Sequence, residues 1–256
     1  MIERLKTAAW FAQRPSHWAH AVGLVVRKLR PDRDGPGYRQ AAELWAAPRA
    51  VSVAEALKRL GLSLDAAIPR LPPALMEDAR ARAQEVPMQM GGPGDIDLLY
   101  ATAKLSAAQR VIETGVAFGW SSLALLAGLE GRAGARLVSV DMPYPKQNNE
   151  AWVGAVVPDR LRGMWRIRRQ PDRPGLERAL ADFDGEIDLC HYDSDKSWYG
   201  RRYAYPKLWR ALRPGGVFIS DDIQDNLAFA EFMDEHRPVF AVTRFDGKYV
   251  GVAVRS

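Results

Sequence analysis

The sequence predicts an α/β protein built around a mostly parallel sheet, and two observations support this fold class. From residue 110 onward, short apolar, β-branched runs alternate with segments compatible with helices, an order typical of βαβ units. The chain ends in two further strand-like runs separated by Asp246-Gly247, a pair that favours a tight hairpin turn. We therefore expect five parallel strands and a C-terminal antiparallel hairpin, which together form a seven-stranded sheet.

The five predicted strands are nearly continuous in apolar residues, as expected when helices cover both faces of a parallel sheet. They lie at 110–114, 136–141, 165–169, 186–193 and 215–222, and the hairpin strands lie at 239–245 and 248–255. Helix-compatible segments separate the parallel strands. In the helix predicted after the fourth strand, Arg201 and Arg202 are expected to face solvent.

Residues 1–87 are expected to form a helical N-terminal extension to a main domain that spans residues 88–256. Helical patterns cover residues 1–30, with a break near Pro15, and recur at 53–61 and 73–85. The stretch 30–37 is rich in proline, glycine and charge, so it is the best candidate for a linker.

The basic character of the chain belongs to the start of this extension. Residues 1–40 hold eight basic and three acidic side chains, which accounts for the whole net charge of +5. The main domain is therefore not expected to bind nucleic acid. Trp10, Phe11 and Trp18 interleave with the basic residues, a pattern that suits a peripheral membrane contact or a contact with a second subunit of a homo-oligomer. Packing on protein is the simpler interpretation.

Composition indicates a globular cytoplasmic protein. A chain of 256 residues that is 47% hydrophobic can build a sizeable core. No run approaches the ~20 apolar residues of a membrane span. The single cysteine, Cys190, excludes an internal disulfide framework and a cysteine-rich metal site.

The first strand of the alternating series runs into a glycine-containing turn. In RVIETGVAFGWSS (110–122), Gly115 and Gly119 allow close approach of a ligand to the backbone, and the helix that follows presents free N–H groups. The spacing is not the G-x-G-x-x-G of dinucleotide sites, because Ala117 holds the middle position. Asp141 ends the second strand, and its two acceptor oxygens suit a vicinal diol.

Three carboxylates end the next two strands of the predicted sheet. Asp193 ends the fourth strand, and Asp221 and Asp222 end the fifth. The carboxyl ends of parallel strands meet at one edge of a sheet, so we expect these side chains to converge. Oxygen donors of this kind suit Mg²⁺, Mn²⁺ or Ca²⁺ rather than zinc, and a cation would offset their repulsion. His191 is expected to be a buried, satisfied histidine.

These motifs together resemble class I S-adenosylmethionine-dependent methyltransferases, which have a Rossmann-like fold. The E-x-G-x-x-x-G pattern at 113–119 resembles their cofactor loop. The resemblance implies that Glu113 sets the loop and the amino-acid end of the cofactor, Ser121 takes the cofactor carboxylate, and Asp141 takes the ribose hydroxyls. The cofactor-binding residues that it implies are Glu113, Gly115, Ala117, Gly119, Ser121 and Asp141.

The acidic motifs narrow the resemblance to the metal-dependent members. Asp193-x-x-Lys196 with the later Asp221-Asp222 is similar to catechol O-methyltransferase, in which Asp-x-x-Lys and Asp-Asn hold Mg²⁺ and the lysine is the general base. The stretches DSDKSWYG and LRPGGVFISDDI are closer to the macrocin O-methyltransferase-like group. The resemblance covers about residues 88–256 and implies that Asp193, Asp221 and Asp222 are metal ligands. The second aspartate replaces the usual asparagine and adds a charge.

The identity of the general base stays open between Lys196 and Asp195. A lysine beside a bound cation can have its pKa lowered enough to accept a proton. Certain relatives use the acid two residues after the first metal ligand, and a carboxylate suffices once a metal acidifies the substrate hydroxyl. We favour Lys196. A plain surface ion pair between the two neighbours is the structural alternative.

The resemblance therefore implies a metal-dependent O-methyltransferase that uses S-adenosylmethionine and acts on a hydroxyl of a small molecule, with a sugar or glycosylated natural product as the expected acceptor. Two alternatives stay open: a metal-independent methyltransferase in which the acids are structural, and a non-catalytic binding protein with a methyltransferase fold. The long segment 142–158, which includes Trp152, is a candidate acceptor-binding loop.

Overall fold

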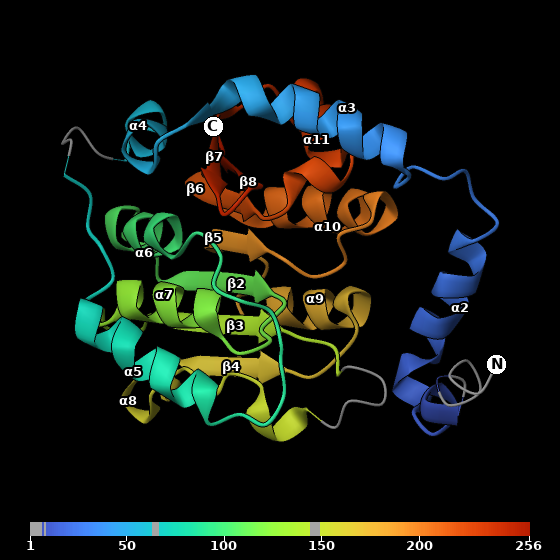
Figure 1. Ribbon diagram of the computed structural model, residues 1–256, viewed down its shortest axis with the longest axis horizontal. Coiled ribbons are helices and arrows are strands. Elements are labelled where there is room, and N and C mark those ends of the chain that lie inside the picture. The colour runs from blue at the N-terminus through green and yellow to red at the C-terminus, as the bar shows by residue number, and fades with distance from the viewer. Residues whose placement is uncertain (1–6, 8, 63–66, 144–148) are drawn as a thin grey trace.

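Alternating strands and helices build a three-layer protein around one mixed sheet (Figure 1). The computed structural model describes residues 7, 9–62, 67–143 and 149–256. Within these residues the sheet has eight strands in the order β1-β7-β8-β6-β5-β2-β3-β4. No helix in the described ranges is long and apolar enough to cross a bilayer.

The predicted parallel series and its closing hairpin are both confirmed. The strands are β2 (Arg110–Thr114), β3 (Arg136–Val140), β4 (Trp165–Arg168), β5 (Ile187–Tyr192), β6 (Leu212–Ser220), β7 (Val239–Phe245) and β8 (Lys248–Val254). β2 to β6 pair in parallel, whereas β8 pairs antiparallel with both β6 and β7. The carboxyl ends of the parallel strands therefore meet at one edge, as expected.

The sheet has one strand more than the predicted seven. β1 (Ala50–Val51) belongs to the N-terminal extension and pairs in parallel with β7, with Ala50 opposite Val242 and Val51 opposite Thr243. A two-residue strand is too short to show the alternation by which strands are recognised in sequences. The extension is thus part of the sheet as well as helical.

Helices cover both faces of the sheet. They are α3 (Pro36–Ala46), α4 (Val53–Arg59), α5 (Pro73–Gln84), α6 (Ile96–Leu105), α7 (Trp120–Leu129), α8 (Asp159–Arg162), α9 (Asp172–Ala181), α10 (Trp198–Ala211) and α11 (Ala228–His236). A further helix, α2 (Trp18–Arg27), lies apart from both faces (Figure 1). α4 to α8 contribute to the core on one face, and α3 with α9 to α11 contribute to the other. Successive strand residues alternate between the two cores: Val111 lies in the first and Ile112 in the second.

Side-chain caps fix where several of these helices begin. The side chain of Ser52 accepts a hydrogen bond from the Glu55 N–H, and the carboxylate of Asp95 accepts one from the Leu98 N–H. Such caps satisfy N–H groups that have no partner within the helix. The other carboxylate oxygen of Asp95 accepts a hydrogen bond from Thr243 Oγ1 at 3.0 Å, so the same residue fastens α6 to β7.

The close packing of β8 against α11 depends on the absence of a side chain at Gly251. A Cβ atom placed there would lie 2.2 Å from the Phe229 ring, and Phe229 is itself fully buried. We expect Gly251→Ala to lower the free energy of unfolding by about 1–3 kcal/mol through overpacking, measured by urea denaturation.

Gly163 provides the matched control, because a Cβ atom there would meet nothing within 4 Å and its φ of −62° is open to any residue. Gly163→Ala should change the stability by less than about 0.5 kcal/mol. Equal effects of the two substitutions would contradict the packing account of β8.

Candidate active site

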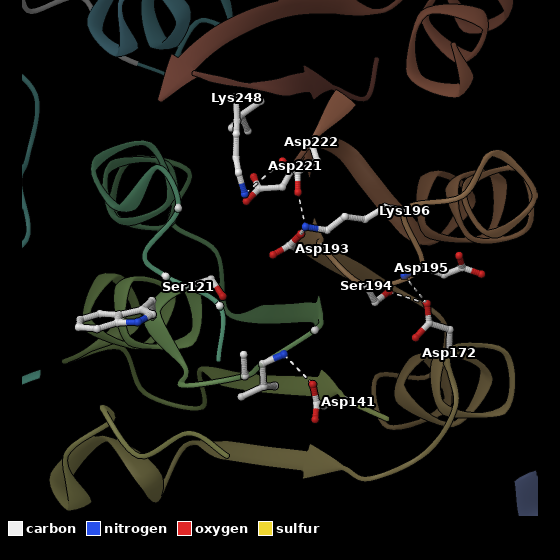
Figure 2. A pocket seen from close by; sticks show the side chains of 18 of the residues that line it. Ser121, Asp141, Asp172, Asp193, Ser194, Asp195, Lys196, Asp221, Asp222 and Lys248 are labelled. Carbon is white, nitrogen blue, oxygen red and sulfur yellow. Dashed lines mark hydrogen bonds and ion pairs between the residues drawn. The ribbon is translucent and has the colours of Figure 1, made fainter. Parts of the chain in front are cut away.

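The carboxyl ends of β2, β3, β5 and β6 open onto one cavity of about 520 Å³ (Figure 2). Its walls carry both predicted half-sites: the glycine turn with Asp141, and the acidic strand ends with Lys196. A third wall comes from α2 of the N-terminal extension, which contributes His20, Leu24 and Arg27. The sequence motifs gave no indication of this third wall.

The turn after β2 needs its first glycine for a close approach between strand ends. Gly115 has a φ of +83°, and a Cβ atom there would lie 2.2 Å from the backbone oxygen of Asp193. Gly115, Ala117 and Ser121 all line the cavity. Gly119 does not line it; its φ of +90° begins α7, and a Cβ atom there would lie 2.9 Å from Gly154 Cα. Gly119 therefore serves the packing behind the turn.

The carboxylate of Asp141 is buried and anchored at the cavity wall. Its Oδ1 accepts a hydrogen bond from the Val116 N–H at 2.8 Å, and its Oδ2 accepts one from the Arg169 guanidinium. Arg169 was missed in the sequence, although it directly follows β4, whose end lies beside that of β3. Burial lowers the pKa of the Arg169 guanidinium, and one of its nitrogens, Nη2, is buried without a hydrogen-bond partner.

Glu113 is not among the residues that line the cavity. The side chain is fully buried, and its Oε2 accepts hydrogen bonds from Ser122 Oγ at 2.5 Å and Ser139 Oγ at 2.7 Å. These bonds join β2 to α7 and β3. Glu113 therefore supports the turn from below.

Lys196 lies among the carboxylates at the strand ends (Figure 2). Its Nζ is 3.0 Å from Asp193 Oδ1 and donates a hydrogen bond to Asp222 Oδ2. A second lysine, Lys248 of β8, places its Nζ 3.4 Å from Asp222 Oδ1. As predicted, Asp193, Asp221 and Asp222 all line the cavity. Two lysines lie beside them.

Mutual electrostatics set the charge state of this group. Burial and the charge of Asp221 raise the pKa of Asp193 to about 6, although Lys196 opposes the shift. Burial lowers the pKa of Lys196, but Asp193 and Asp222 together raise it by more, so the net pKa lies above its ordinary value. Beside a bound cation we expect the pKa of Lys196 to be lowered. The neighbouring side chains alone raise that pKa instead.

His191 links the two half-sites beneath the cavity. It is fully buried, as expected, but neither ring nitrogen forms a hydrogen bond, so the expectation that it is satisfied is wrong. Nδ1 lies 3.7 Å from Glu113 Oε1, and Nε2 lies 3.5 Å from Asp221 Oδ1. Burial lowers the pKa of His191, but Asp221 and Glu113 together raise it by more, to about 10. His191 therefore acts as an internal positive charge between two carboxylates.

Two carboxylate oxygens have the chemistry that a divalent cation requires. Asp193 Oδ1 and Asp221 Oδ1 are buried and form no hydrogen bond of good geometry, although Lys196 Nζ lies 3.0 Å from the first and His191 Nε2 lies 3.5 Å from the second. Such hard oxygen donors suit Mg²⁺, Mn²⁺ or Ca²⁺. Asp222, the third expected ligand, is instead paired with lysines. In the described ranges, no three histidine, cysteine, aspartate or glutamate side chains form a metal-binding group. The oxygen donors are of the type that suits a cation, and the Lys196 ammonium lies among them, in contact with Asp193 and Asp222.

Asp195 points away from this cluster (Figure 2), and its partner Arg27 lies on α2. Its two carboxylate oxygens lie 3.1 and 3.2 Å from Arg27 Nη1, and Oδ1 also accepts hydrogen bonds from the N–H and Oγ of Ser197. Ser197 in turn caps α10 through the Gly200 N–H. Asp195 thus connects the extension to the start of α10. The sequence does not predict this role, because Arg27 lies 168 positions away from Asp195.

The expectation that Arg201 faces solvent is wrong. Arg201 is fully buried, and its Nη2 donates hydrogen bonds to the backbone oxygens of Asp221 and Asp222 at 3.2 and 2.8 Å. These bonds hold Asp222 in a left-handed conformation with a φ of +52°. The helical pattern of α10 does not predict that the turn after β6 covers this position.

The candidate acceptor loop is described only in part. Residues 144–148 lie outside the described residues. Trp152 packs against the core cluster that contains α7, and it does not line the cavity, whereas Met142 does. Within the described part of this segment, the contact with the cavity comes directly after Asp141.

Comparison with known proteins agrees with this geometry. A family model described as a methyltransferase domain matches residues 112–223. A mouse protein, catechol O-methyltransferase domain-containing protein 1, is 31% identical over 121 residues, which make up 47% of this chain and 44% of the mouse protein. The match therefore spans less than half the length of that curated relative.

Solved structures share the fold at low identity. An O-methyltransferase from Bacillus cereus in complex with SAH is 19% identical, with a TM-score of 0.54 over 83% of this chain and 99% of that chain. A methyltransferase from Geobacter sulfurreducens is 17% identical, with a TM-score of 0.53 over 78% of this chain and 96% of that chain. At these identities the likeness shows a shared fold.

The segment matched by the family model begins in β2 and ends just after Asp222. It therefore contains the glycine turn, Asp141, the acidic cluster and Lys196, the same residues that line the cavity described above. The order of the parallel strands and the closing hairpin agree with the same assignment. The part of the chain that builds the cavity is thus similar to a methyltransferase domain, and its fold is that of the solved methyltransferases.

Proposed function

We propose that this chain is an O-methyltransferase that transfers a methyl group from S-adenosylmethionine to a hydroxyl of a small molecule, with the help of a divalent cation. The observation that supports this function best is that both half-sites open onto one cavity of about 520 Å³, a size within the range of small-molecule sites. Asp141 and Lys196 lie on opposite sides of that cavity (Figure 2).

The glycine turn and the start of α7 supply the cofactor half of the site. Ser121 lies in the first turn of α7, where free N–H groups and the helix dipole favour a carboxylate. Asp141 is fixed by Val116 and Arg169, so it can accept hydrogen bonds from a diol without reorienting. When bound, S-adenosylmethionine supplies the electrophilic methyl group, and these residues orient it.

The acidic strand ends supply the acceptor half. Asp193 and Asp221 would hold a divalent cation, with Asp222 as the third ligand once it is released from Lys196. Such a cation lowers the pKa of a bound hydroxyl. Lys196 is the candidate base in the cavity, and it can accept a proton only when the neighbouring carboxylates no longer raise its pKa. Holding both reactants in one geometry accounts for most of the expected rate enhancement.

A polar acceptor suits the walls of the cavity. Asp172, Ser194 and His20 line it beside the acidic cluster, and their donors and acceptors suit a molecule with several hydroxyl groups. We therefore propose a sugar or a glycosylated natural product as the acceptor class, which is also the class that the macrocin-type resemblance implies.

The contacts of Lys196 support a second candidate, a methyltransferase that needs no metal. Its Nζ contacts both Asp193 and Asp222, so an ammonium group already neutralises part of the acidic cluster. In this candidate the carboxylates are structural, and they position Lys196. The two candidates differ in their response to chelation.

The first prediction concerns cofactor binding. Asp141→Asn should weaken binding of S-adenosylhomocysteine about tenfold, because one charged acceptor of the diol is lost, equivalent to ~1.4 kcal/mol. Asp182→Asn is the matched control, because Asp182 is a carboxylate paired with the neighbouring Arg168 but does not line the cavity. Calorimetry should show unchanged affinity in the control. Absence of binding by the unaltered protein would instead favour the non-catalytic binding protein.

The second prediction concerns the cation. We expect methyl transfer to a panel of polyhydroxylated acceptors, followed by mass spectrometry, to stop after treatment with EDTA and to return with Mg²⁺. Mg²⁺ should also raise the melting temperature of the protein, and Asp221→Asn should abolish that rise because it removes a charged oxygen donor. Asp246→Asn, which alters another acidic residue of the cavity wall, should preserve it. Full activity after chelation would favour the metal-independent candidate.

The third prediction separates the two candidate bases. Lys196→Met should lower kcat about 10²- to 10⁴-fold, the usual contribution of a general base, with little change in affinity for S-adenosylhomocysteine. Asp195→Asn should lower kcat less than tenfold, as roughly expected for a group that holds structure rather than a proton, because Arg27 and Ser197 engage its carboxylate. The reverse pattern in steady-state kinetics would identify Asp195 as the base.

A further inference from the structure

An exposed apolar stripe runs along α2 of the N-terminal extension. Within the described residues, eight large hydrophobic side chains are exposed, and five of them fall between positions 18 and 29. They are Trp18 at 54%, Val22 at 61%, Val25 at 62%, Val26 at 41% and Leu29 at 83% exposure. Single exposed apolar residues are normal on protein surfaces, but a contiguous group marks an interaction site.

The stripe lies on the face of α2 opposite to the one that lines the cavity. Trp18, Val22, Val25 and Val26 follow the i, i+4, i+7, i+8 spacing of one helix face. His20, Leu24 and Arg27 line the cavity, and all three are partly buried. Figure 1 shows α2 beside the carboxyl ends of the strands, apart from the helices that cover the sheet. One face of α2 therefore meets the site, and the other faces outward.

The charge around the stripe has a single sign. No acidic residue occurs between Lys6 and Asp32, a segment that contains Arg14, Arg27, Lys28 and Arg30. Arg27 is paired with Asp195, and the Arg30 guanidinium lies over the Tyr199 ring with its Cζ 5.2 Å from the ring centroid. Both Lys28 and Arg30 are exposed just after α2. Long basic side chains beside an apolar face can extend towards anionic groups while that face is buried.

We propose that α2 docks this protein on an anionic lipid surface, with the stripe at the level of the headgroups and with Lys28 and Arg30 near the lipid phosphates. A basic, acid-free segment complements a negative surface. The other possible occupant is a second copy of the chain. A two-fold contact between two stripes would bring together two segments of the same charge, which opposes association. The proposal is independent of the reaction assigned to the cavity.

Vesicle sedimentation of the full chain tests the proposal. We expect binding to phosphatidylcholine vesicles that contain phosphatidylglycerol, weaker binding to phosphatidylcholine alone, and release at high salt. Val22→Asp with Val25→Asp should lower the bound fraction at least tenfold, as roughly expected for charges placed in an apolar contact. Lys28→Glu with Arg30→Glu should lower binding to the anionic vesicles and leave the weak binding to phosphatidylcholine unchanged.

Leu44→Asp is the matched control, because Leu44 is 69% exposed but lies on α3, outside the stripe. It should bind vesicles as the unaltered chain does, and all variants should keep the same melting temperature. Vesicle binding that survives the Val22 and Val25 substitutions would overturn the proposal. So would a lack of vesicle binding by the unaltered chain. A dimer in light scattering that those substitutions dissociate would then identify a second copy of the chain as the occupant of the stripe.

Discussion

The rest of the site depends on one constraint, the positive charge that must offset the clustered carboxylates at the strand ends. Asp193, Asp221 and Asp222 approach one another because β5 and β6 are adjacent and parallel. Such a group is unfavourable unless positive charge accompanies it. Lys196 supplies that charge at the cavity, and His191 supplies it from below. A divalent cation would compete with Lys196 for these carboxylates, so the metal and the protonation state of the lysine are coupled in the proposed enzyme.

The backbone around this charge cluster is held by groups outside it. Arg201 fixes the turn that carries Asp221 and Asp222, and Gly115 lets the end of β2 lie against Asp193. The linker also takes part, because Asp34 accepts hydrogen bonds from the Trp198 N–H and from Asn226 Nδ2. The extension therefore helps to fix the start of α10, directly after Lys196. Contacts of Asp193, before Lys196 in the chain, and of Trp198, after it, therefore fix the position of the lysine.

How well the sequence predicts each part of this site depends on how far apart in the chain the interacting residues lie. Strands, the closing hairpin and the residues at strand ends follow from local patterns, so the sequence predicts that Asp141 and the acidic cluster lie at one edge of the sheet, where they line the cavity. Contacts between distant segments leave no local signal. Arg27 reaches Asp195, and Arg169 reaches Asp141, only because the fold brings them together. Glu113 shows the complementary case, because a motif position can act from beneath a cavity without lining it.

The most direct test of the account is a crystal structure of the protein with S-adenosylhomocysteine and Mn²⁺, measured for anomalous scattering. We expect an anomalous peak between Asp193 and Asp221, displacement of the Lys196 ammonium from Asp222, and the ribose of the ligand against Asp141. A fully occupied S-adenosylhomocysteine site with no anomalous peak at these carboxylates, and with Lys196 still paired with Asp222, would contradict the metal-dependent mechanism.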